Sequence, residues 1–356
     1  MPNPDVLPHA DPPALAGFDA VIDVRSPAEF AEDHVPGALN LPVLDNDERA
    51  RVGTLYVQES RFLARRIGAA LVARNVARHL ETALADKPVD FKPLIYCWRG
   101  GQRSNAMATI FSQIGWRTVV LGGGYRTYRR RVQARLYDEP LGLDLVLLDG
   151  GTGSGKTAVL HALAAAGVQT LDLEALAEHR GSLFGGWPGQ VQPAQKLFES
   201  RLLAAIEALD PARPVVVEAE SHKVGDRMLP PGLWQAMALA PRIELQAPRA
   251  ARAGYLVSAY ADITYDRPAL LDAVARLPIH IGRTDRETLV AMIDAGDDLG
   301  LAEALMALHY DPAYARSSRK DERPRLGFVK MEALDAASIV AAAEAVARLV
   351  DDVRRL

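Results

Sequence analysis

Short apolar runs alternate with longer amphipathic stretches along the whole chain. The runs have the length and apolar content of buried strands, and the stretches between them have helical spacing. The longest helical stretch covers about residues 47–84, as one long or broken helix, and residues 35–42 predict a turn into a short edge strand. The other predicted strands are 20–24, 93–96, 118–121, 143–149, 169–173, 214–217, 242–245 and 326–331. Strands that alternate with helices in this way predict an α/β fold with largely parallel sheets.

The chain has a natural division near residues 138–142, where Asp-Glu-Pro-Leu-Gly interrupts a helical pattern. A length of 356 residues, at roughly 150 residues per domain, also favours two domains. We therefore predict one domain over residues 1–137 and a second over 138–356. The second would include a helical portion over about residues 268–310.

Composition and charge narrow the class of protein. The chain is 49% hydrophobic and 24% charged, which is typical of a packed globular protein and excludes wholesale disorder. No stretch approaches the roughly 18 apolar residues of a membrane span. The first residues lack the basic start and apolar middle of a signal peptide, so we expect a cytoplasmic protein. The net charge of −4 gives no general attraction to a polyanion, so nucleic-acid binding would need local basic clusters.

Residues 150–157 read Gly-Gly-Thr-Gly-Ser-Gly-Lys-Thr and satisfy the phosphate-loop pattern G-x-x-x-x-G-K-[ST]. A predicted strand precedes the loop and a helix follows it, so backbone N–H groups and the positive helix end can face one anion. Lys156 would hold the outer phosphates, and the Thr157 hydroxyl could hold Mg²⁺. The motif fits a nucleoside triphosphate and a simple diphosphate equally. The predicted phosphate-binding residues are Gly151, Thr152, Gly153, Ser154, Gly155, Lys156 and Thr157.

Two acidic residues end a neighbouring predicted strand. Glu218 and Glu220 are two positions apart, so in an extended strand both would lie on the same face. They could then approach Mg²⁺ or the leaving group of a phosphate donor. The alternative is a pair of solvated acids at a strand end, and no metal site is certain.

Cys97 is the single cysteine, so the chain forms no internal disulfide and has no all-cysteine metal site. It begins Cys-Trp-Arg-Gly-Gly-Gln-Arg, a C-x5-R loop between a predicted strand and a predicted helix. We expect the loop's N–H groups, the helix dipole and the guanidinium groups of Arg99 and Arg103 to favour the thiolate. Such a loop suits an anionic adduct: a phosphate, a persulfide or a perselenide.

The sequence before Cys97 separates these possibilities. Residues 23–30 (Asp-Val-Arg-Ser-Pro-Ala-Glu-Phe) and 34–42 (His-Val-Pro-Gly-Ala-Leu-Asn-Leu-Pro) closely resemble the opening of the rhodanese family. Residues 118–123 are similar to the strand and glycine turn that follow the rhodanese active loop. The resemblance covers about residues 15–130 and implies that Cys97 handles sulfur or selenium.

Both halves together resemble the tRNA 2-selenouridine synthase family over most of the chain. Two residues depart from the expected pattern, since Gln102 and His222 stand where Met and Arg are expected. The His222 departure leaves the charge near the acids of the second strand open. The matching stretches are 96–104 (YCWRGGQRS), 123–126, the phosphate loop, 179–185, 192–193 with 198–199, and 217–225 (VEAESHKVG).

This second resemblance implies a rhodanese-like parallel-sheet domain followed by a P-loop NTPase-like α/β domain. It also implies an enzyme that replaces sulfur by selenium in the wobble 2-thiouridine of tRNA, with selenophosphate as selenium donor. The family can also attach a geranyl group from geranyl diphosphate to the thiouridine sulfur, which makes that sulfur a better leaving group. Cys97, Arg99 and Arg103 would be catalytic, and the phosphate loop would bind the diphosphate. A selenophosphate-producing enzyme would be a partner.

A tRNA substrate needs a basic surface, and one segment is rich in arginine. Arg126, Arg129, Arg130 and Arg131 follow the glycine turn and could contact tRNA phosphates near the anticodon, with Tyr125 or Tyr128 stacked on a base. The alternative is a solvated helix face.

Two other functions remain open. The first is an ATP-dependent tRNA sulfurtransferase or kinase-type enzyme with a rhodanese domain. The second is a binding module whose two loops only sense anions. A C-x5-R phosphatase fits less well, because Tyr96 stands where that class commonly has His.

Overall fold

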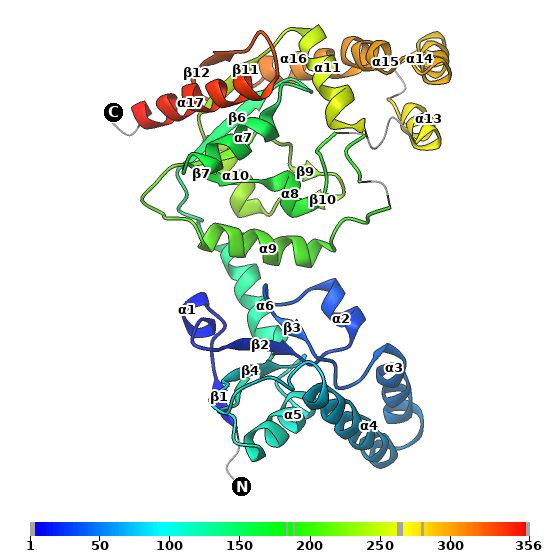
Figure 1. Cartoon of the computed structure of the whole chain (residues 1–356), viewed down its shortest axis with the longest axis vertical. Helices are drawn as coiled ribbons and strands as arrows, with labels where there is room; N and C mark the ends of the chain where they lie inside the picture. Colours follow the sequence, from blue (N-terminus) through cyan, green and yellow to red (C-terminus); the bar gives the residue numbers. More distant parts are fainter. Residues whose placement is uncertain (1–3, 183, 188, 262–265, 279–280, 354–356) are drawn as a thin grey trace. The chain divides into compact units, whose positions relative to one another are not determined.

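The structure is a computed structural model, and it describes residues 4–182, 184–187, 189–261, 266–278 and 281–353. The chain forms two compact units (Figure 1). Unit 1 contains residues 1–139 and 193–207, and unit 2 contains residues 140–192 and 208–356. Both units combine a parallel sheet with helices, so the predicted α/β fold class is confirmed.

Unit 1 contains a five-stranded sheet in the order β1-β5-β4-β2-β3, in which all neighbours are parallel. The strand that carries the cysteine loop, β4, is therefore the central strand. Its strands are β1 (Asp5–Leu7), β2 (Ala20–Asp23), β3 (Leu39–Asn40), β4 (Pro93–Tyr96) and β5 (Val119–Leu121). Its helices are α1 (Pro12–Leu15), α2 (Pro27–Glu32), α3 (Asn46–Thr54), α4 (Arg61–Glu81), α5 (Gln102–Gln113), α6 (Tyr125–Gln133) and α9 (Gln195–Glu207), with one-turn π-helical segments η1 (Leu55–Glu59) and η2 (Ala134–Asp138).

Local sequence signals explain where these elements begin. Ser26 and Glu29 form a reciprocal capping box at the start of α2, and Pro27 occupies its first position. The predicted helix over 47–84 is broken into α3, η1 and α4, because Ser60 leaves helical geometry and caps α4 by accepting a hydrogen bond from Leu63 N. The apolar core of the unit lies between the sheet and these helices, with Ile22, Ile95 and Phe111 fully buried.

Helix α9 belongs to unit 1 although it lies between segments of unit 2 in the sequence. Arg129 of α6 forms ion pairs with Glu199 of α9 and with Asp33, and Arg131 pairs with Glu207. Glu199 is 1% exposed and also accepts a hydrogen bond from Tyr137. The predicted division, at 137 and 138 with everything later in the second domain, therefore differs from the compact units at residues 193–207. The reason is that these tertiary ion pairs hold α9 to α6.

Unit 2 contains a second five-stranded parallel sheet, in the order β12-β11-β6-β8-β7. The phosphate loop follows β6, which is again the central strand. The strands are β6 (Leu145–Gly150), β7 (Gln169–Leu171), β8 (Val215–Glu218), β11 (Arg242–Gln246) and β12 (Arg325–Lys330), with a small antiparallel pair, β9 (Lys223–Val224) and β10 (Arg227–Met228). The helices are α7 (Lys156–Ala165), α8 (Leu173–Ala177), α10 (Pro231–Leu239), α11 (Arg249–Ala259), α13 (Arg267–Ala275), α14 (Arg283–Ala295), α15 (Asp298–Leu305), α16 (Asp311–Arg319) and α17 (Ala336–Val353), with the π-helical segment η3 (Met306–Tyr310).

The predicted helical portion of the second domain forms a separate small core. Helices α13, α14 and α15 bury Leu270, Leu289 and Leu301 against one another. The main core of unit 2 packs α7 and α17 on the sheet, with Val159 and Val346 fully buried. The stretch is helical, as its amphipathic pattern predicted, and its separate core was not predicted.

None of the helices that the structure describes is both long enough and apolar enough to cross a membrane.

Candidate functional site

Cys97 lies at the carboxyl end of β4, where the chain turns into the cysteine loop (residues 97–103). The residue is 3% exposed. Its Sγ atom accepts a hydrogen bond from Gly101 N at 3.2 Å and lies 3.2 Å from Ser104 Oγ. Helix α5 begins at Gln102, so the positive end of a helix lies beside the sulfur. The carboxyl edge of a parallel sheet is where α/β proteins bind ligands.

The electrostatics of this loop favour the thiolate. Burial raises the pKa of Cys97, but the Ser104 hydroxyl and the backbone N–H groups of Ser104, Arg99 and Gly101 together lower that pKa below its usual value. A lower pKa increases the fraction of reactive thiolate at neutral pH. The lowered pKa fits the predicted role of Cys97 as a nucleophile or anion-binding group, and that role stays a prediction.

The glycine turn after β5 packs closely against the backbone of the cysteine loop. Gly124 has φ +59°, and a Cβ atom there would collide with the carbonyl oxygen of Cys97. This close approach lets Tyr125 N donate a hydrogen bond of 2.8 Å to the Cys97 carbonyl. The glycine run at residues 122–124 therefore has a structural role, in which the backbone of one loop supports the backbone of the other.

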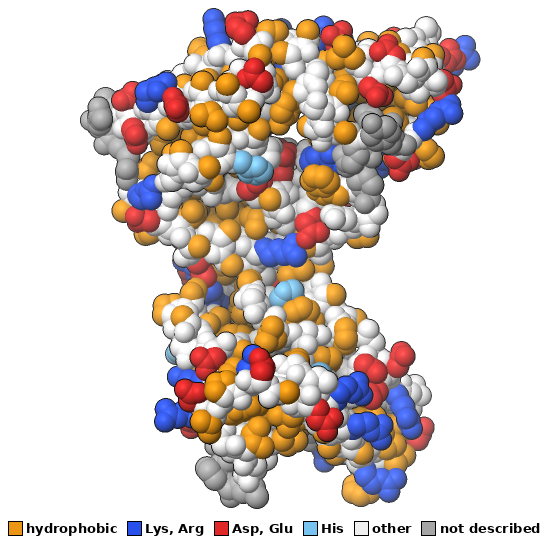
Figure 2. All heavy atoms as spheres, viewed as in Figure 1, with side chains coloured by type: hydrophobic (Ala, Val, Ile, Leu, Met, Phe, Trp, Pro, Cys, Tyr) orange, Lys and Arg blue, Asp and Glu red, His pale blue; other side chains and the backbone are white. Residues whose placement is uncertain are grey.

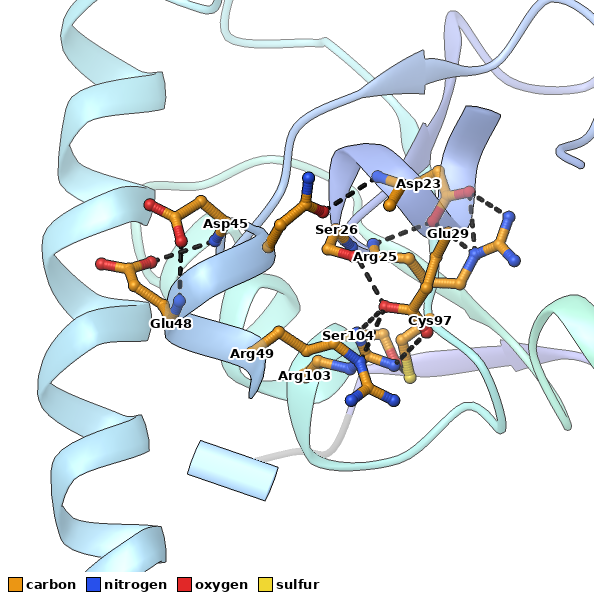
Figure 3. Close-up of polar contacts among 12 residues, drawn as sticks. Asp23, Arg25, Ser26, Glu29, Asp45, Glu48, Arg49, Cys97, Arg103 and Ser104 are labelled. Atoms are coloured by element: carbon orange, nitrogen blue, oxygen red, sulfur yellow. Dashed lines mark hydrogen bonds and ion pairs between the residues drawn. The ribbon is translucent and has the colours of Figure 1, made fainter. Parts of the chain in front are cut away.

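Arg103 faces an acid rather than the sulfur. Its guanidinium donates hydrogen bonds of 2.8 and 3.3 Å to the carboxylate of Glu29, and Arg49 lies 3.4 Å from the same carboxylate (Figure 3). Burial alone would raise the pKa of Glu29, but Arg103, the Ser26 amide and Arg49 lower it to about 2.

The expectation that Arg99 and Arg103 stabilise the thiolate directly is therefore corrected. Arg103 is paired with Glu29, and the groups that lower the Cys97 pKa are Ser104 and backbone amides. Arg99 contributes its backbone N–H, and its side chain is exposed. Ser104 is the residue that sequence reasoning missed, although it directly follows the C-x5-R motif.

The Asp-Val-Arg opening motif forms a buried ion pair. Arg25 is 1% exposed, and its Nη2 atom lies 2.6 Å from both Asp23 Oδ2 and the Asp33 carbonyl oxygen. Its guanidinium also lies 4.0 Å from the centre of the Tyr125 ring. The motif therefore joins β2, the end of α2 and the start of α6 beneath the cysteine loop, and its role is structural.

The phosphate loop has the predicted strand–loop–helix context. It joins the end of β6 to α7, and α7 begins at Lys156 as the sequence predicted. Lys156 Nζ donates a hydrogen bond of 2.9 Å to the Gly150 carbonyl, so the ammonium group lies across the loop. Arg252 donates to the Thr152 carbonyl and is paired with Asp311, which fixes the middle of the loop.

A cleft of about 490 Å³ opens at the phosphate loop, within unit 2. Residues 152–157 form one wall, and Trp187, Tyr255 and Tyr260 contribute aromatic side chains to the lining. Arg180 stacks against two of these rings, with its guanidinium 4.0 Å from the Trp187 ring centre and 4.4 Å from that of Tyr260. The cleft therefore offers amides and an ammonium group for phosphate beside flat aromatic surfaces.

Glu174 is an acid of this cleft that the sequence did not single out. Its Oε2 atom accepts a hydrogen bond of 2.8 Å from the Thr157 hydroxyl. Burial, reinforced by the nearby Glu220 carboxylate, raises the pKa of Glu174 to about 7. Gly181, at φ +67°, lies against both carboxylates, and a Cβ atom there would meet Glu174 Oε1 at 2.5 Å and Glu220 Oε1 at 2.9 Å.

The two predicted acids have different surroundings. Strand β8 ends at Glu218, and Glu220 N donates a hydrogen bond of 2.8 Å to the Glu218 carbonyl, so the chain turns between them. Glu220 lines the cleft, whereas Glu218 is fully buried and accepts a hydrogen bond from Leu173 N. The expectation that both acids share one strand face is therefore wrong, because the strand stops between them.

The donor set at the phosphate loop suits a magnesium ion that is held mainly by phosphates. Among the residues that the structure describes, no group of three or more His, Cys, Asp and Glu side chains could hold a metal ion. Mg²⁺ usually takes one or two protein oxygens and completes its shell with water and substrate phosphates. Thr157 with Glu174 or Glu220 can supply those oxygens.

Two of the four arginines of the segment at residues 126–131 on α6 form ion pairs within unit 1. Arg129 and Arg131 form the ion pairs with α9 described above, and Tyr125 and Tyr128 are each 3% exposed. Of the four arginines that the sequence offered for tRNA contacts, Arg129 and Arg131 are therefore engaged in ion pairs within unit 1. Arg126 and Arg130 remain exposed.

Helix α4 presents a basic surface that sequence reasoning missed. Arg61, Arg65, Arg66 and Arg74 are exposed, and none of them forms an ion pair with another described residue. Figure 2 shows Lys and Arg side chains, with acidic ones between them, over the α3–α4 part of unit 1. The signal in the sequence was the spacing of these arginines on the polar side of a long amphipathic helix.

Comparisons with known proteins find a family match for each of the two parts of the chain that carry these loops. Residues 10–131 match the rhodanese-like domain family, and residues 143–269 match the family described as the tRNA 2-selenouridine synthase AAA domain. A tRNA 2-selenouridine synthase from Verminephrobacter eiseniae is 35% identical over 337 residues, which cover 84% of this chain and 89% of that protein. One from Aeromonas salmonicida is 33% identical over 325 residues, covering 83% and 86%. One from Nitrosomonas europaea is 34% identical over 264 residues, covering 73% and 68%. This chain belongs to the tRNA 2-selenouridine synthase family.

Proposed function

We propose that this protein is a tRNA-modifying transferase that replaces sulfur by selenium in wobble 2-thiouridine. It would act in two steps, through an S-geranylated base, with geranyl diphosphate and selenophosphate as co-substrates. The observation that carries this proposal is the presence of two anion-binding loops, each after the central strand of its own parallel sheet. The relatives named tRNA 2-selenouridine synthase support the same reaction.

In the first step, the thiouridine sulfur attacks the first carbon of the geranyl chain. A C–S bond forms, the C–O bond to the diphosphate breaks, and diphosphate leaves with the electron pair. Lys156 and the amides of the phosphate loop stabilise the charge on that leaving group. With Mg²⁺ bound, Thr157 and Glu220 would hold the ion, which would neutralise further charge on the diphosphate.

An apolar pocket beside the phosphate loop supports a prenyl donor over a nucleotide. The pocket has about 80 Å³ and is lined by side chains that include Phe184, Leu270 and Leu301. It shares Thr152 and Leu256 with the cleft of about 490 Å³. A geranyl chain would therefore begin in the cleft and end against these apolar walls, which removes its surface from water.

In the second step, the cysteine loop holds the selenium donor and the selenium attacks C2 of the base. A C–Se bond forms, the C–S bond breaks, and geranyl thiol leaves after taking up a proton. Hydrolysis of the P–Se bond then releases phosphate. The Gly101 amide, the Ser104 hydroxyl and the start of α5 favour an anion at this position, so they would orient the selenophosphate beside Cys97 without a bond between sulfur and selenium.

For tRNA binding we propose the exposed arginines of α4 in place of the segment on α6. Arg65 and Arg66 are on the same helix as the walls of the cavity described below and have no acidic partner among the described residues. Contacts to the anticodon stem would be made by such unpaired guanidinium groups. A cytoplasmic location and a selenophosphate-producing partner remain predictions.

Two substitutions test whether selenation uses the cysteine loop and geranylation uses the phosphate loop. Cys97→Ala should abolish selenation while geranylation continues, so S-geranyl-2-thiouridine accumulates. Lys156→Ala should stop geranylation, while selenation of a pre-geranylated tRNA continues. The measurement is mass spectrometry of wobble nucleosides after incubation with thiolated tRNA, geranyl diphosphate and selenophosphate. Arg99→Ala is the matched control for the cysteine loop, because its side chain is exposed.

Loss of both steps in Cys97→Ala would contradict separate sites. Normal geranylation with failed selenation in Lys156→Ala would reverse the assignment of the two loops.

The alternative is an ATP-dependent tRNA sulfurtransferase or kinase-type enzyme. The stacked group of Arg180, Trp187 and Tyr260 in the cleft favours it, since a purine could lie on the same aromatic surfaces. ATP hydrolysis in step with product formation would support this alternative and exclude the diphosphate assignment.

A further inference from the structure

A cavity of about 400 Å³ lies in unit 1 between α3, α4 and α5. This volume falls in the range of roughly 300–1,000 Å³ that is typical of small-molecule sites. Its walls are mostly short apolar side chains, with Ala69 and Ala73 from α4 and Ala106 from α5. Ala69 and Ala73 are exposed, so the cavity is open to solvent.

The last two residues of the cysteine loop line the cavity. Gln102 and Arg103, the first two residues of α5, form part of its wall. The residue before them, Gly101, donates its N–H to Cys97 Sγ. Neighbouring Cα atoms are about 3.8 Å apart, so the wall begins one residue from the amide that contacts the sulfur.

The cavity is lined by both apolar side chains and arginines, and this combination indicates what kind of group would bind. Apolar surface that faces water is unfavourable until something covers it, and a contiguous apolar hollow commonly marks a binding site. Arg65 and Arg103 lie in the cavity lining, and Arg61 and Arg66 are exposed on the same helix as Arg65. An apolar group attached to a polyanion would pack against the apolar lining, and its negative charges would pair with these guanidinium groups.

We propose that this cavity binds the hydrocarbon chain of an S-geranylated tRNA base during the selenation step. This assignment rests on the proposed two-step function. The chain is attached to the sulfur that must leave when selenium attacks, so a site for it has to adjoin the cysteine loop. Binding of the chain would orient the C2 atom of the base toward the selenium donor, while Arg65 contacts a nearby phosphate.

The test measures binding as well as turnover. Two anticodon stem-loop RNAs are compared, one with S-geranyl-2-thiouridine and one with S-methyl-2-thiouridine, by fluorescence anisotropy. The protein should prefer the geranylated RNA, because the longer chain buries more apolar surface. Ala69→Phe fills the cavity and should reduce that preference by at least about tenfold.

Two further variants serve as controls. Ala70→Phe lies on the same helix and is exposed, but it does not line the cavity, so the preference should change by less than about twofold. Ala302→Phe fills the apolar pocket of unit 2 and should slow geranyl transfer without changing the preference. An unchanged rate of Cys97 alkylation in Ala69→Phe shows that the cysteine loop is intact.

Several results would overturn the assignment. They are equal binding of the two RNAs, a preference that is lost in Ala302→Phe instead of Ala69→Phe, or a change in oligomeric state as the only effect of Ala69→Phe. If the protein prefers the geranylated RNA through Ala69 but never converts it to selenouridine, the cavity assignment stands and the proposed function fails.

Discussion

At the scale of single residues, one hydroxyl and a few backbone amides lower the pKa of Cys97. Ser104 is fully buried, and its Oγ atom lies 3.2 Å from Cys97 Sγ and 3.1 Å from the Gly101 carbonyl. When the sulfur is ionised, the hydroxyl can turn its proton toward it. The side chain therefore stabilises one protonation state of the cysteine more than the other.

This contact predicts the pH dependence of Cys97 alkylation. Ser104→Ala removes a hydrogen bond to the thiolate, so the pKa of Cys97 should rise, by about one pH unit. The rate of iodoacetamide alkylation, measured against pH, should shift its midpoint upward by that amount. Ser112→Ala on the same helix is the control. An unchanged midpoint in Ser104→Ala would mean that the backbone amides alone set the pKa.

A second residue-scale prediction concerns Glu29, whose pKa falls to about 2 in the folded protein from the ordinary value of 4.5. An acid with a lowered pKa stabilises the fold above its unfolded pKa, and that stability is lost as the pH falls from 4.5 toward 2. Glu29→Gln should therefore lower the free energy of unfolding of unit 1 at pH 7 by about 2 kcal/mol, after allowance for partial exposure.

Urea unfolding, followed by the fluorescence of tryptophans in unit 1, measures this difference. The difference in the free energy of unfolding between Glu29→Gln and the parent protein should decrease steadily below pH 4.5. Glu32→Gln is the control, because that side chain is 52% exposed and pairs only with an exposed lysine. A gap that stays constant with pH would show that the effect is not ionic.

Some site residues were predictable from sequence and others were not. Cys97 and Lys156 were, because each belongs to a motif whose spacing the chemistry requires. The partner of Arg103 was not, since Glu29 lies far away in the sequence and only the fold brings them together. Glu174 was missed for the same reason, because nothing local marks it as a neighbour of Thr157.

At the scale of elements, helix α4 combines two properties in one amphipathic helix. Its buried side packs Leu71, Val72 and Val76 into the core of unit 1. Its exposed arginines have no acidic partners among the described residues. The helix can therefore bind phosphates without breaking any ion pair of the fold, whereas Arg129 and Arg131 of α6 cannot.

This difference predicts which helix contributes to tRNA affinity. Arg65→Glu with Arg66→Glu should weaken tRNA binding at least about tenfold and reduce its salt dependence, since two phosphate contacts are lost. Arg126→Glu with Arg130→Glu on α6 should have a smaller effect. Filter binding over a range of salt concentrations distinguishes them. If the double substitution on α6 weakened tRNA binding more than the one on α4, the tRNA contacts would lie on α6, as the sequence predicted.

Most elements were predictable, and the exceptions have physical causes. The runs that became β2, β4, β6 and β8 are buried in the middle of sheets, so their apolar pattern is strong. Strand β1 was missed because it is three residues long and lies in a proline-rich polar segment. The membership of α9 in unit 1 depends on tertiary ion pairs, which no local pattern encodes.

At the scale of the whole molecule, the same arrangement occurs twice. In each unit the loop that we predict to bind anions follows the central strand and precedes a helix. This repetition follows from parallel-sheet geometry, in which amides and helix N-termini gather at the carboxyl edge. The two units then differ in chemistry through the residues at that edge, a thiol in one and an ammonium group in the other.

Separate sites predict complementation between inactive variants. Cys97→Ala and Lys156→Ala should each fail to convert thiolated tRNA to selenouridine. A mixture of the two should form selenouridine, because the geranylated tRNA made by the first variant is a substrate for the second. Mass spectrometry of nucleosides detects the product. No product from the mixture, with each half-reaction still present, would mean that the intermediate is never released.

The path of the chain also has a practical consequence for dissecting the protein. Because residues 193–207 return to unit 1, the polypeptide passes between the units three times, near residues 139, 192 and 207. A fragment ending at residue 139 would lack α9, and Arg129 and Tyr137 would lose their shared carboxylate partner, Glu199. Neither unit can therefore be excised intact with a single cut, and an expression fragment of the rhodanese-like unit should carry α9 through a designed linker.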